Sequence, residues 1–75
     1  MKSLVEFVAR SLVDSPDKVQ VEEINRHDAT ILELQVAPED LGRVIGRQGR
    51  TARAIRNLIA ATEHSGGRTI LDILD

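Results

Sequence analysis

The stretch RVIGRQGR, residues 43–50, contains two of the chain's five glycines, three positions apart. Gly46 follows an apolar pair and suits the left-handed conformation that is common just beyond a helix end. Gly49 allows a second helix to begin without a side chain in the way. The stretch therefore predicts a tight corner between two helices. A lone GxxG pattern has many structural uses, so the corner by itself does not define a function.

The charge around this corner is of one sign. Residues 41–62 contain five arginines and no acidic residue, although the net charge of the whole chain is −2. A helix face that is merely solvated usually carries both signs, whereas attraction to phosphate requires one sign. The five arginines are Arg43, Arg47, Arg50, Arg53 and Arg56. On a helical wheel of residues 50–62, an apolar arc expected to face the core holds Ala52, Ile55, Leu58, Ile59 and Thr62, and an outward-facing basic arc holds Arg50, Arg53, Arg56 and Asn57.

The composition limits the size and the chemistry of the protein. Seventy-five residues predict one domain, residues 1–75, and Phe7 as the only aromatic residue predicts an aliphatic core. The absence of cysteine fits a reducing compartment, so we expect a cytoplasmic protein without a membrane segment. His27 and His64 have no second ligand at a matching spacing. We therefore expect no enzyme activity, no metal site and no cofactor.

The pattern of apolar residues predicts the elements around the corner. A hairpin is predicted from two alternating runs, although the first run loses its alternation near Glu22, as at a bulge or a frayed strand end. Glu39 and Asp40 suit the positive end of a helix dipole, so a short helix is expected to start beside them. The predicted elements are a helix at 2–13, the hairpin around a turn at 25–28, a short helix from Pro38, a helix at 50–62 ended by HSGGR, and a strand in TILDILD.

This order, α-β-β-α-α-β, predicts the fold class. The two helices that follow the hairpin connect it to the final strand and must cover one face of a small sheet, and the first helix can pack on the same face. The sequence therefore predicts a two-layer α+β domain with its helices on one face of the sheet.

The corner in this setting resembles a known family. VIGRQG between two helices, after a hairpin and before a strand, resembles the KH domain, whose GxxG loop grips the backbone of single-stranded RNA or DNA. The longer stretch VAPEDLGRVIGRQGRTARAIRNLI is similar to the KhpA family of small bacterial single-KH-domain RNA-binding proteins, over essentially the full length. The helix before the hairpin, with none after the last strand, resembles the type II arrangement. This resemblance implies a three-stranded mixed sheet.

The resemblance also implies roles for individual residues. Gly46 and Gly49 match the loop glycines that allow close approach of the nucleic acid backbone, and Arg47 and Gln48 match the middle pair that faces it. Apolar neighbours are implied to be Val44 and Ile45, which seat the loop, and Val36 and Ile55, which border a groove for bases, although Ile55 also fits the core.

We therefore expect a protein that binds single-stranded RNA, or single-stranded DNA, through residues 46–49 with help from Arg43, Arg50, Arg53 and Arg56. Such a protein would act as a post-transcriptional regulator or RNA chaperone. Without Trp or Tyr for base stacking, we expect modest affinity dominated by phosphate contacts.

Three further expectations concern partners and alternatives. The resemblance implies a homodimer or a larger KH-containing partner, and the small side chains of Ala60 and Ala61 would let a second helix approach closely. One alternative function is a winged-helix-like DNA-binding module formed by residues 38–62. The other is a protein-interaction domain in which the corner is only structural.

Overall fold

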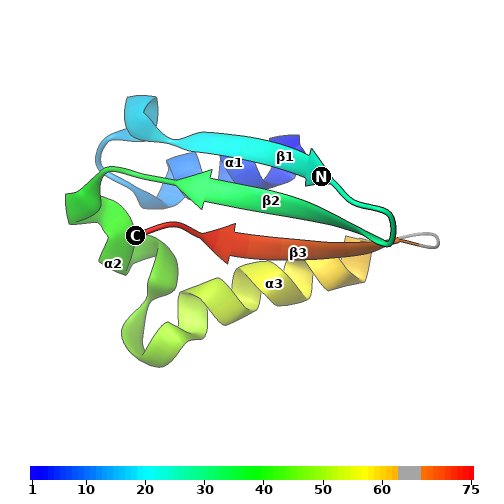
Figure 1. Ribbon diagram of the computed structural model, residues 1–75. Helices are drawn as coiled ribbons and strands as arrows, with labels where there is room; N and C mark the ends of the chain where they lie inside the picture. Colours follow the sequence, from blue (N-terminus) through cyan, green and yellow to red (C-terminus); the bar gives the residue numbers. More distant parts are fainter. Residues whose placement is uncertain (63–66) are drawn as a thin grey trace.

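The computed structural model describes residues 1–62 and 67–75, so the predicted position of His64 and most of HSGGR lie outside the described residues. The observed order confirms the predicted α-β-β-α-α-β order, with short 3₁₀ turns between some elements (Figure 1). The elements are α1 (Lys2–Leu12), β1 (Gln20–Asn25), β2 (Ala29–Gln35), α2 (Leu41–Ile45), α3 (Arg50–Thr62) and β3 (Arg68–Ile73), with 3₁₀ turns at Pro16–Lys18, Pro38–Asp40 and Arg47–Gly49.

The three strands form one mixed sheet in the order β1-β2-β3, as predicted. β1 pairs antiparallel with β2, and β2 pairs parallel with β3. The register of the hairpin is continuous from Gln20 opposite Gln35 to Asn25 opposite Thr30, so the lost alternation near Glu22 is not a bulge. Instead, Ile24 lies on the face of the sheet opposite to Val21, because side chains alternate along a strand.

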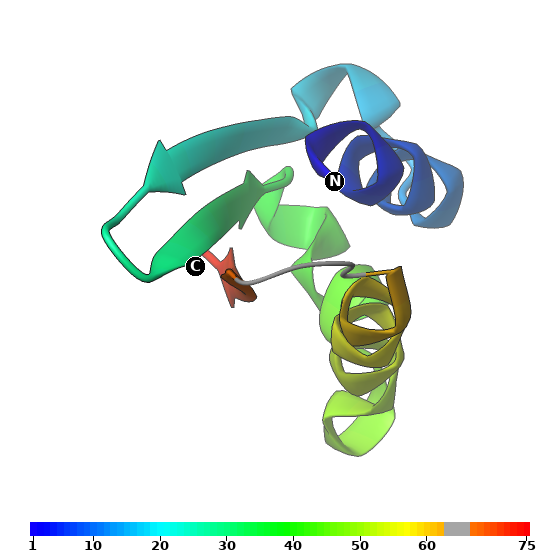
Figure 2. The same ribbon diagram turned by 90° about the vertical axis from the view of Figure 1, so that its right-hand side faces the viewer.

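The helices cover one face of the sheet. Figures 1 and 2 show α1 and α3 side by side on this face, with α2 between their ends, while no described segment lies over the opposite face. The core between the two layers is aliphatic, as predicted. Its buried residues are Val5, Ala9, Val19, Val21, Leu32, Leu34, Val36, Val44, Ile55, Ile59 and Leu71. None of the helices in residues 1–62 and 67–75 is long and apolar enough to cross a membrane.

The prediction that Leu58 of α3 belongs to the core is wrong. Leu58 is 40% exposed, whereas Ile55 and Ile59 are almost completely buried. Leu58 lies at the margin of the arc, where the wheel alone cannot tell how closely the neighbouring elements pack. Thr62 Oγ1 donates a hydrogen bond to Met1 Sδ (3.3 Å), which joins the end of α3 to the residue before α1.

Asp40 fastens the start of α2 to the segment after α1. Its side chain is 1% exposed and accepts hydrogen bonds from the backbone N–H groups of Asp14 (3.2 Å) and Ser15 (3.0 Å). The sequence predicted only a favourable interaction with the helix dipole here. The observed bonds give this carboxylate a second role, because they hold α1 and α2 together and thereby fix the position from which the glycine corner leaves α2.

Candidate nucleic-acid interface

The corner between α2 and α3 has a backbone that only particular residues can adopt. Gly46 has φ 77° and ψ 169°, a region that is essentially restricted to glycine, and Gly49 has φ 75°. Gly46 N–H donates to Gly42 C=O (2.8 Å) and closes α2, and Gly49 N–H donates to Gly46 C=O (3.1 Å). Gly46 has the expected positive φ, but its ψ of 169° is extended and not left-handed helical, and Gly49 has a positive φ as well.

The middle pair of the corner lies on its outer side. Arg47 and Gln48 are both exposed, and Gln48 has a left-handed backbone with φ 57° and ψ 25°, which the sequence did not predict. The N–H of Arg50, the first residue of α3, donates to Arg47 C=O, so the corner continues directly into α3. The corner therefore combines an exposed basic side chain with the start of α3, and the glycines leave no side chain between a phosphate and the backbone.

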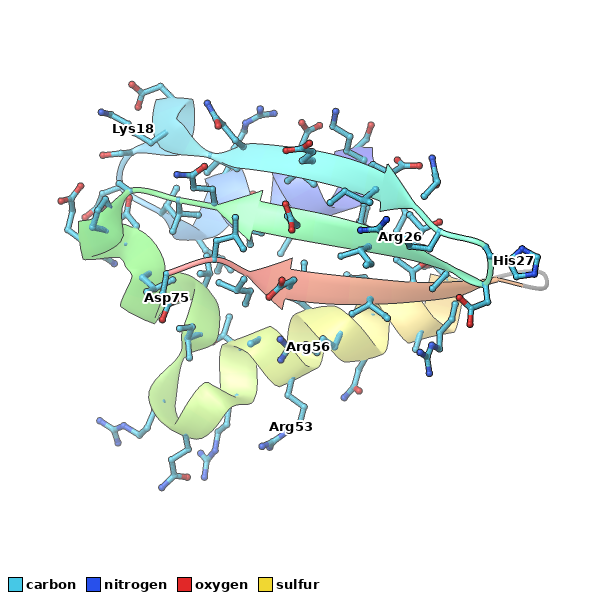
Figure 3. All side chains as sticks on the ribbon, in the orientation of Figure 1. Lys18, Arg26, His27, Arg53, Arg56 and Asp75 are labelled. Carbon is cyan, nitrogen blue, oxygen red and sulfur yellow. The ribbon has the colours of Figure 1, made fainter. Side chains whose placement is uncertain are left out.

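The arginines of α3 line the helix next to the corner. Arg50, Arg53 and Arg56 are exposed, which confirms the predicted basic arc. Arg50 Nη2 donates to Gln48 Oε1 (3.3 Å), so it lies against the loop. Arg56 Nη2 donates to Leu71 C=O (3.3 Å), so it reaches across to β3. Figure 3 shows Arg53 extending away from the sheet and Arg56 on the part of α3 beside β3.

Arg43 is held differently from the other arginines. Its guanidinium forms an ion pair with Asp14 (2.9 Å) and lies 3.4 Å from the buried carboxylate of Asp40. The segment that is free of acidic residues in the sequence is therefore not free of them in space at this position. The two carboxylates compete with a phosphate for Arg43, so we expect Arg47, Arg50, Arg53 and Arg56 to supply most of the positive potential.

A groove runs from the corner along α3 and β3. A hollow of about 490 Å³ is lined by Ile45, Gly49, Ala52, Arg53, Arg56 and Ile73. A second hollow, of about 330 Å³, continues past Arg56 and is lined by Arg56, Ile59, Arg68, Thr69, Ile70 and Leu71. The walls are apolar, with arginines along the rim on α3. The exposed backbone of β3, an edge strand, forms the other side.

The apolar residues that border this groove differ from those implied by the resemblance. Val36 and Ile55 are 8% and 5% exposed and belong to the core, so neither lines the groove beside the corner. Ile45 and Ile73 take this place. Ile45 directly precedes Gly46, so its place beside the loop could have been predicted from the sequence. Ile73 shares a face of β3 with Leu71.

No group of His, Cys, Asp or Glu in residues 1–62 and 67–75 is arranged to hold a metal ion. The corner, its arginines and the groove are therefore the features that define the site. Together with the element order and the mixed sheet, they define a KH domain of the type II topology.

Comparison with known proteins gives the family. Residues 2–73 match the family model described as KhpA/KhpB, KH domain, and the chain belongs to this family. It is 53% identical to the RNA-binding protein KhpA of Clostridium acetobutylicum over 75 residues, covering 99% of this chain and 100% of that protein. It is 49% identical to RNA-binding protein KhpA of Halalkalibacterium halodurans over 76 residues, covering 100% of both. No solved structure matches the chain.

These relatives bear on two predictions. Their names describe binding and not catalysis, in agreement with the prediction of a protein without enzyme activity. The family resemblance inferred from the corner and its surroundings is confirmed over nearly the whole chain.

Proposed function

We propose that this protein binds single-stranded RNA with the corner at residues 46–49, as the name of its relatives also suggests. The observation that carries the proposal is the glycine corner, which opens onto a groove bordered by arginines. The sugar-phosphate backbone would lie against Gly46 and Gly49, where no side chain obstructs it. The bases would enter the groove between α3 and β3 and contact Ile45, Ala52 and Ile73.

The same geometry explains why a single strand fits better than a duplex. The groove lies between a helix and an edge strand, so bases must leave a stack to enter it. No aromatic ring is available there, because Phe7 is the chain's only aromatic residue and lies 70% exposed on α1. Affinity must therefore come mainly from phosphate contacts, with weak sequence preference, as in an RNA chaperone or a post-transcriptional regulator.

The salt dependence of binding tests whether phosphate contacts supply most of the affinity. With three or four arginines neutralising phosphates, we expect the logarithm of the association constant to fall with the logarithm of salt concentration with a slope of about −2 to −3. Fluorescence anisotropy of a labelled single-stranded RNA at several salt concentrations measures the slope. A flat response would remove the arginines from the mechanism.

A comparison of substrates distinguishes the two other functions considered. A winged-helix-like module would prefer duplex DNA, and a protein-interaction domain would bind neither nucleic acid. The short α2 and the bond from Arg56 to β3 favour the single-stranded substrate, because they place α3 against the sheet edge. Anisotropy titrations with single-stranded RNA, single-stranded DNA and duplex DNA at one salt concentration separate the three functions.

We also propose that the chain forms a homodimer, or pairs with a larger KH-containing protein, through α3. Leu58 is 40% exposed and stands one turn before Ala61 on the same side of the helix, so the surface there is apolar. Ala60 and Ala61 are exposed and small, so a second helix can approach closely. A small domain with a thin core gains stability from such an association, and two loops on one strand would raise the avidity for RNA.

Light scattering at tens of micromolar tests this association. We expect a mass of about twice the 8.3 kDa of one chain, and a monomeric mass for Ala61→Asp, because a charge would be buried without a partner. Arg53→Asp is the matched control, since it places the same group on the basic arc of α3. A monomeric parent protein contradicts the proposal of a homodimer, and a dimer unaffected by Ala61→Asp moves the interface elsewhere.

A further inference from the structure

The face of the sheet that no described helix covers carries its side chains in two rows. The register places Glu22, Glu33 and Asp72 side by side on β1, β2 and β3, which we call the acidic row. Two residues away on each strand, Ile24, Ile31 and Ile70 also stand side by side, after Glu22 on β1 and before Glu33 and Asp72 on β2 and β3. We call these three residues the isoleucine row. Both rows lie on the uncovered face, because their strand neighbours Val21, Leu32 and Leu71 are buried on the other.

Each row is unfavourable for an isolated domain. Carboxylates directly opposite one another across strands repel, and none of the ion pairs among the described residues includes a member of the acidic row. Ile70 is 37% exposed, and Ile24 and Ile31 are half-buried although no described segment packs over them. A ligand that supplied positive charge and apolar surface together would relieve both costs.

The two rows select the chemistry of this ligand. RNA is disfavoured, because three adjacent carboxylates repel phosphates. A second copy of this chain fits less well: a twofold arrangement about the isoleucine row would place Arg68 and Arg26, which Figure 3 shows on this face, near the acidic row of the other copy, two arginines against three carboxylates. A protein segment with several Lys or Arg residues beside an apolar stripe complements all three carboxylates and the isoleucines.

We propose that the acidic and isoleucine rows form a docking surface for an amphipathic helix of a partner protein, with Lys or Arg one turn away from its apolar residues. Three strands span about 10 Å, close to the diameter of one helix. Successive rows on one face are separated by about 7 Å, and a helix advances about 5.4 Å per turn. If an apolar residue of the partner helix lies over the isoleucine row, a Lys or Arg four positions away in that helix lies over the acidic row. The aliphatic part of this Lys or Arg side chain then contacts the isoleucines.

The location of this surface leaves the proposed RNA site free. The glycine corner and α3 belong to the helical layer (Figure 2). By the alternation of side chains along the strands, both rows lie on the uncovered face, and only Ile70, on the edge strand, also lines the second hollow of the groove. β3 separates them, since Ile73 lines the groove and Asp72 belongs to the acidic row. The protein would therefore hold RNA and a basic partner segment at the same time.

Titration with a synthetic helix tests the proposal. The probe is a fluorescent peptide of about 18 residues, long enough for helix formation, with leucines on one face and lysines flanking them. Two control peptides have the lysines replaced by glutamates, or the same composition with the leucines scattered around the helix. We expect saturable binding of the first peptide only, and nuclear magnetic resonance shifts concentrated on alternate residues of β1, β2 and β3.

Variants of the protein locate the binding. Glu33→Lys should weaken binding of the lysine peptide by about tenfold or more, because it reverses the central charge of the acidic row. Glu39→Lys, the same change at an exposed position outside this face, should alter it by less than about twofold. Ile70→Thr, which keeps a β-branched residue in the strand, should weaken it several-fold. Circular dichroism of the same variants checks that the domain is folded, because Ile70 also lines the second hollow of the groove and its replacement could alter RNA affinity.

Several results would overturn the proposal. These are the absence of saturable binding, equal losses in Glu33→Lys and Glu39→Lys, or shifts confined to α1 and α3. Light scattering that detects self-association abolished by Glu33→Lys would assign the face to a second copy, and would also overturn it. Because the readout is peptide binding, failure here leaves the RNA proposal untouched.

Discussion

Replacing Arg47 and Gln48 together by aspartate is expected to lower the affinity for single-stranded RNA by about 100-fold or more. Both side chains are exposed at the centre of the corner, so their replacement removes one positive charge and adds two negative charges where the phosphates would lie. The fold should survive, because neither side chain is buried. Fluorescence anisotropy measures the affinity, and circular dichroism confirms the fold.

A matched variant separates this local effect from the change in net charge. Lys18→Asp combined with Gln20→Asp makes the same change in charge at two exposed positions. Figure 3 shows Lys18 at the far side of the molecule from Arg53 and Arg56. This control should lose no more than about threefold in affinity at moderate salt. If the corner variant binds RNA like the parent protein, the corner is not the RNA clamp.

Gly46→Ala is expected to lower the free energy of unfolding by about 2 to 4 kcal/mol. A Cβ atom at this position would collide with Thr51, including its Oγ1, and would lie 2.8 Å from the Thr51 backbone nitrogen. That nitrogen belongs to α3, so it cannot move aside as a flexible side chain could. The backbone conformation itself, with φ 77° and ψ 169°, also excludes a side chain. Urea denaturation followed by circular dichroism measures the loss.

Gly49→Ala provides the comparison for this prediction. Gly49 also has a positive φ, of 75°, but an added Cβ would meet nothing within 4 Å. Its cost is then the strain of a left-handed residue alone, about 1 kcal/mol. If Gly46→Ala and Gly49→Ala lower the free energy of unfolding equally, backbone strain dominates and the close packing of Thr51 on Gly46 contributes little.

Local patterns were sufficient to predict the elements and their order. The helical spacing in α1 and α3, the alternation of Leu32 and Leu34, and the glycine corner are each encoded within a few residues. Once the order was known, the short connections left few ways to pack three helices on three strands. The mixed sheet came from the family resemblance, because no local signal states that β3 runs parallel to β2.

The errors concern contacts between segments distant in the sequence. Arg43 was counted with the basic group, but its ion pair is with Asp14, 29 positions away. Leu58 was assigned to the core because the wheel shows a direction and not the distance to the neighbouring elements. Val36 was placed beside the groove, although the packing buries it and leaves Ile45 and Ile73 there, whereas Ile55 is buried as its place on the core arc predicted. The contribution of each site residue to RNA binding stays a prediction.

The parallel pairing of β2 with β3 determines when the groove can exist during folding. The hairpin closes over residues 26–28, whereas β3 reaches β2 only after residues 36–67 have been looped back, which is a much slower search for the chain. The glycine corner lies within that loop, but Ile73, which lines the groove, arrives with β3. In the proposed mode of binding, a nascent chain that has made the corner and not yet β3 would have a phosphate-binding loop without a place for bases, and recognition of RNA would begin with the last strand.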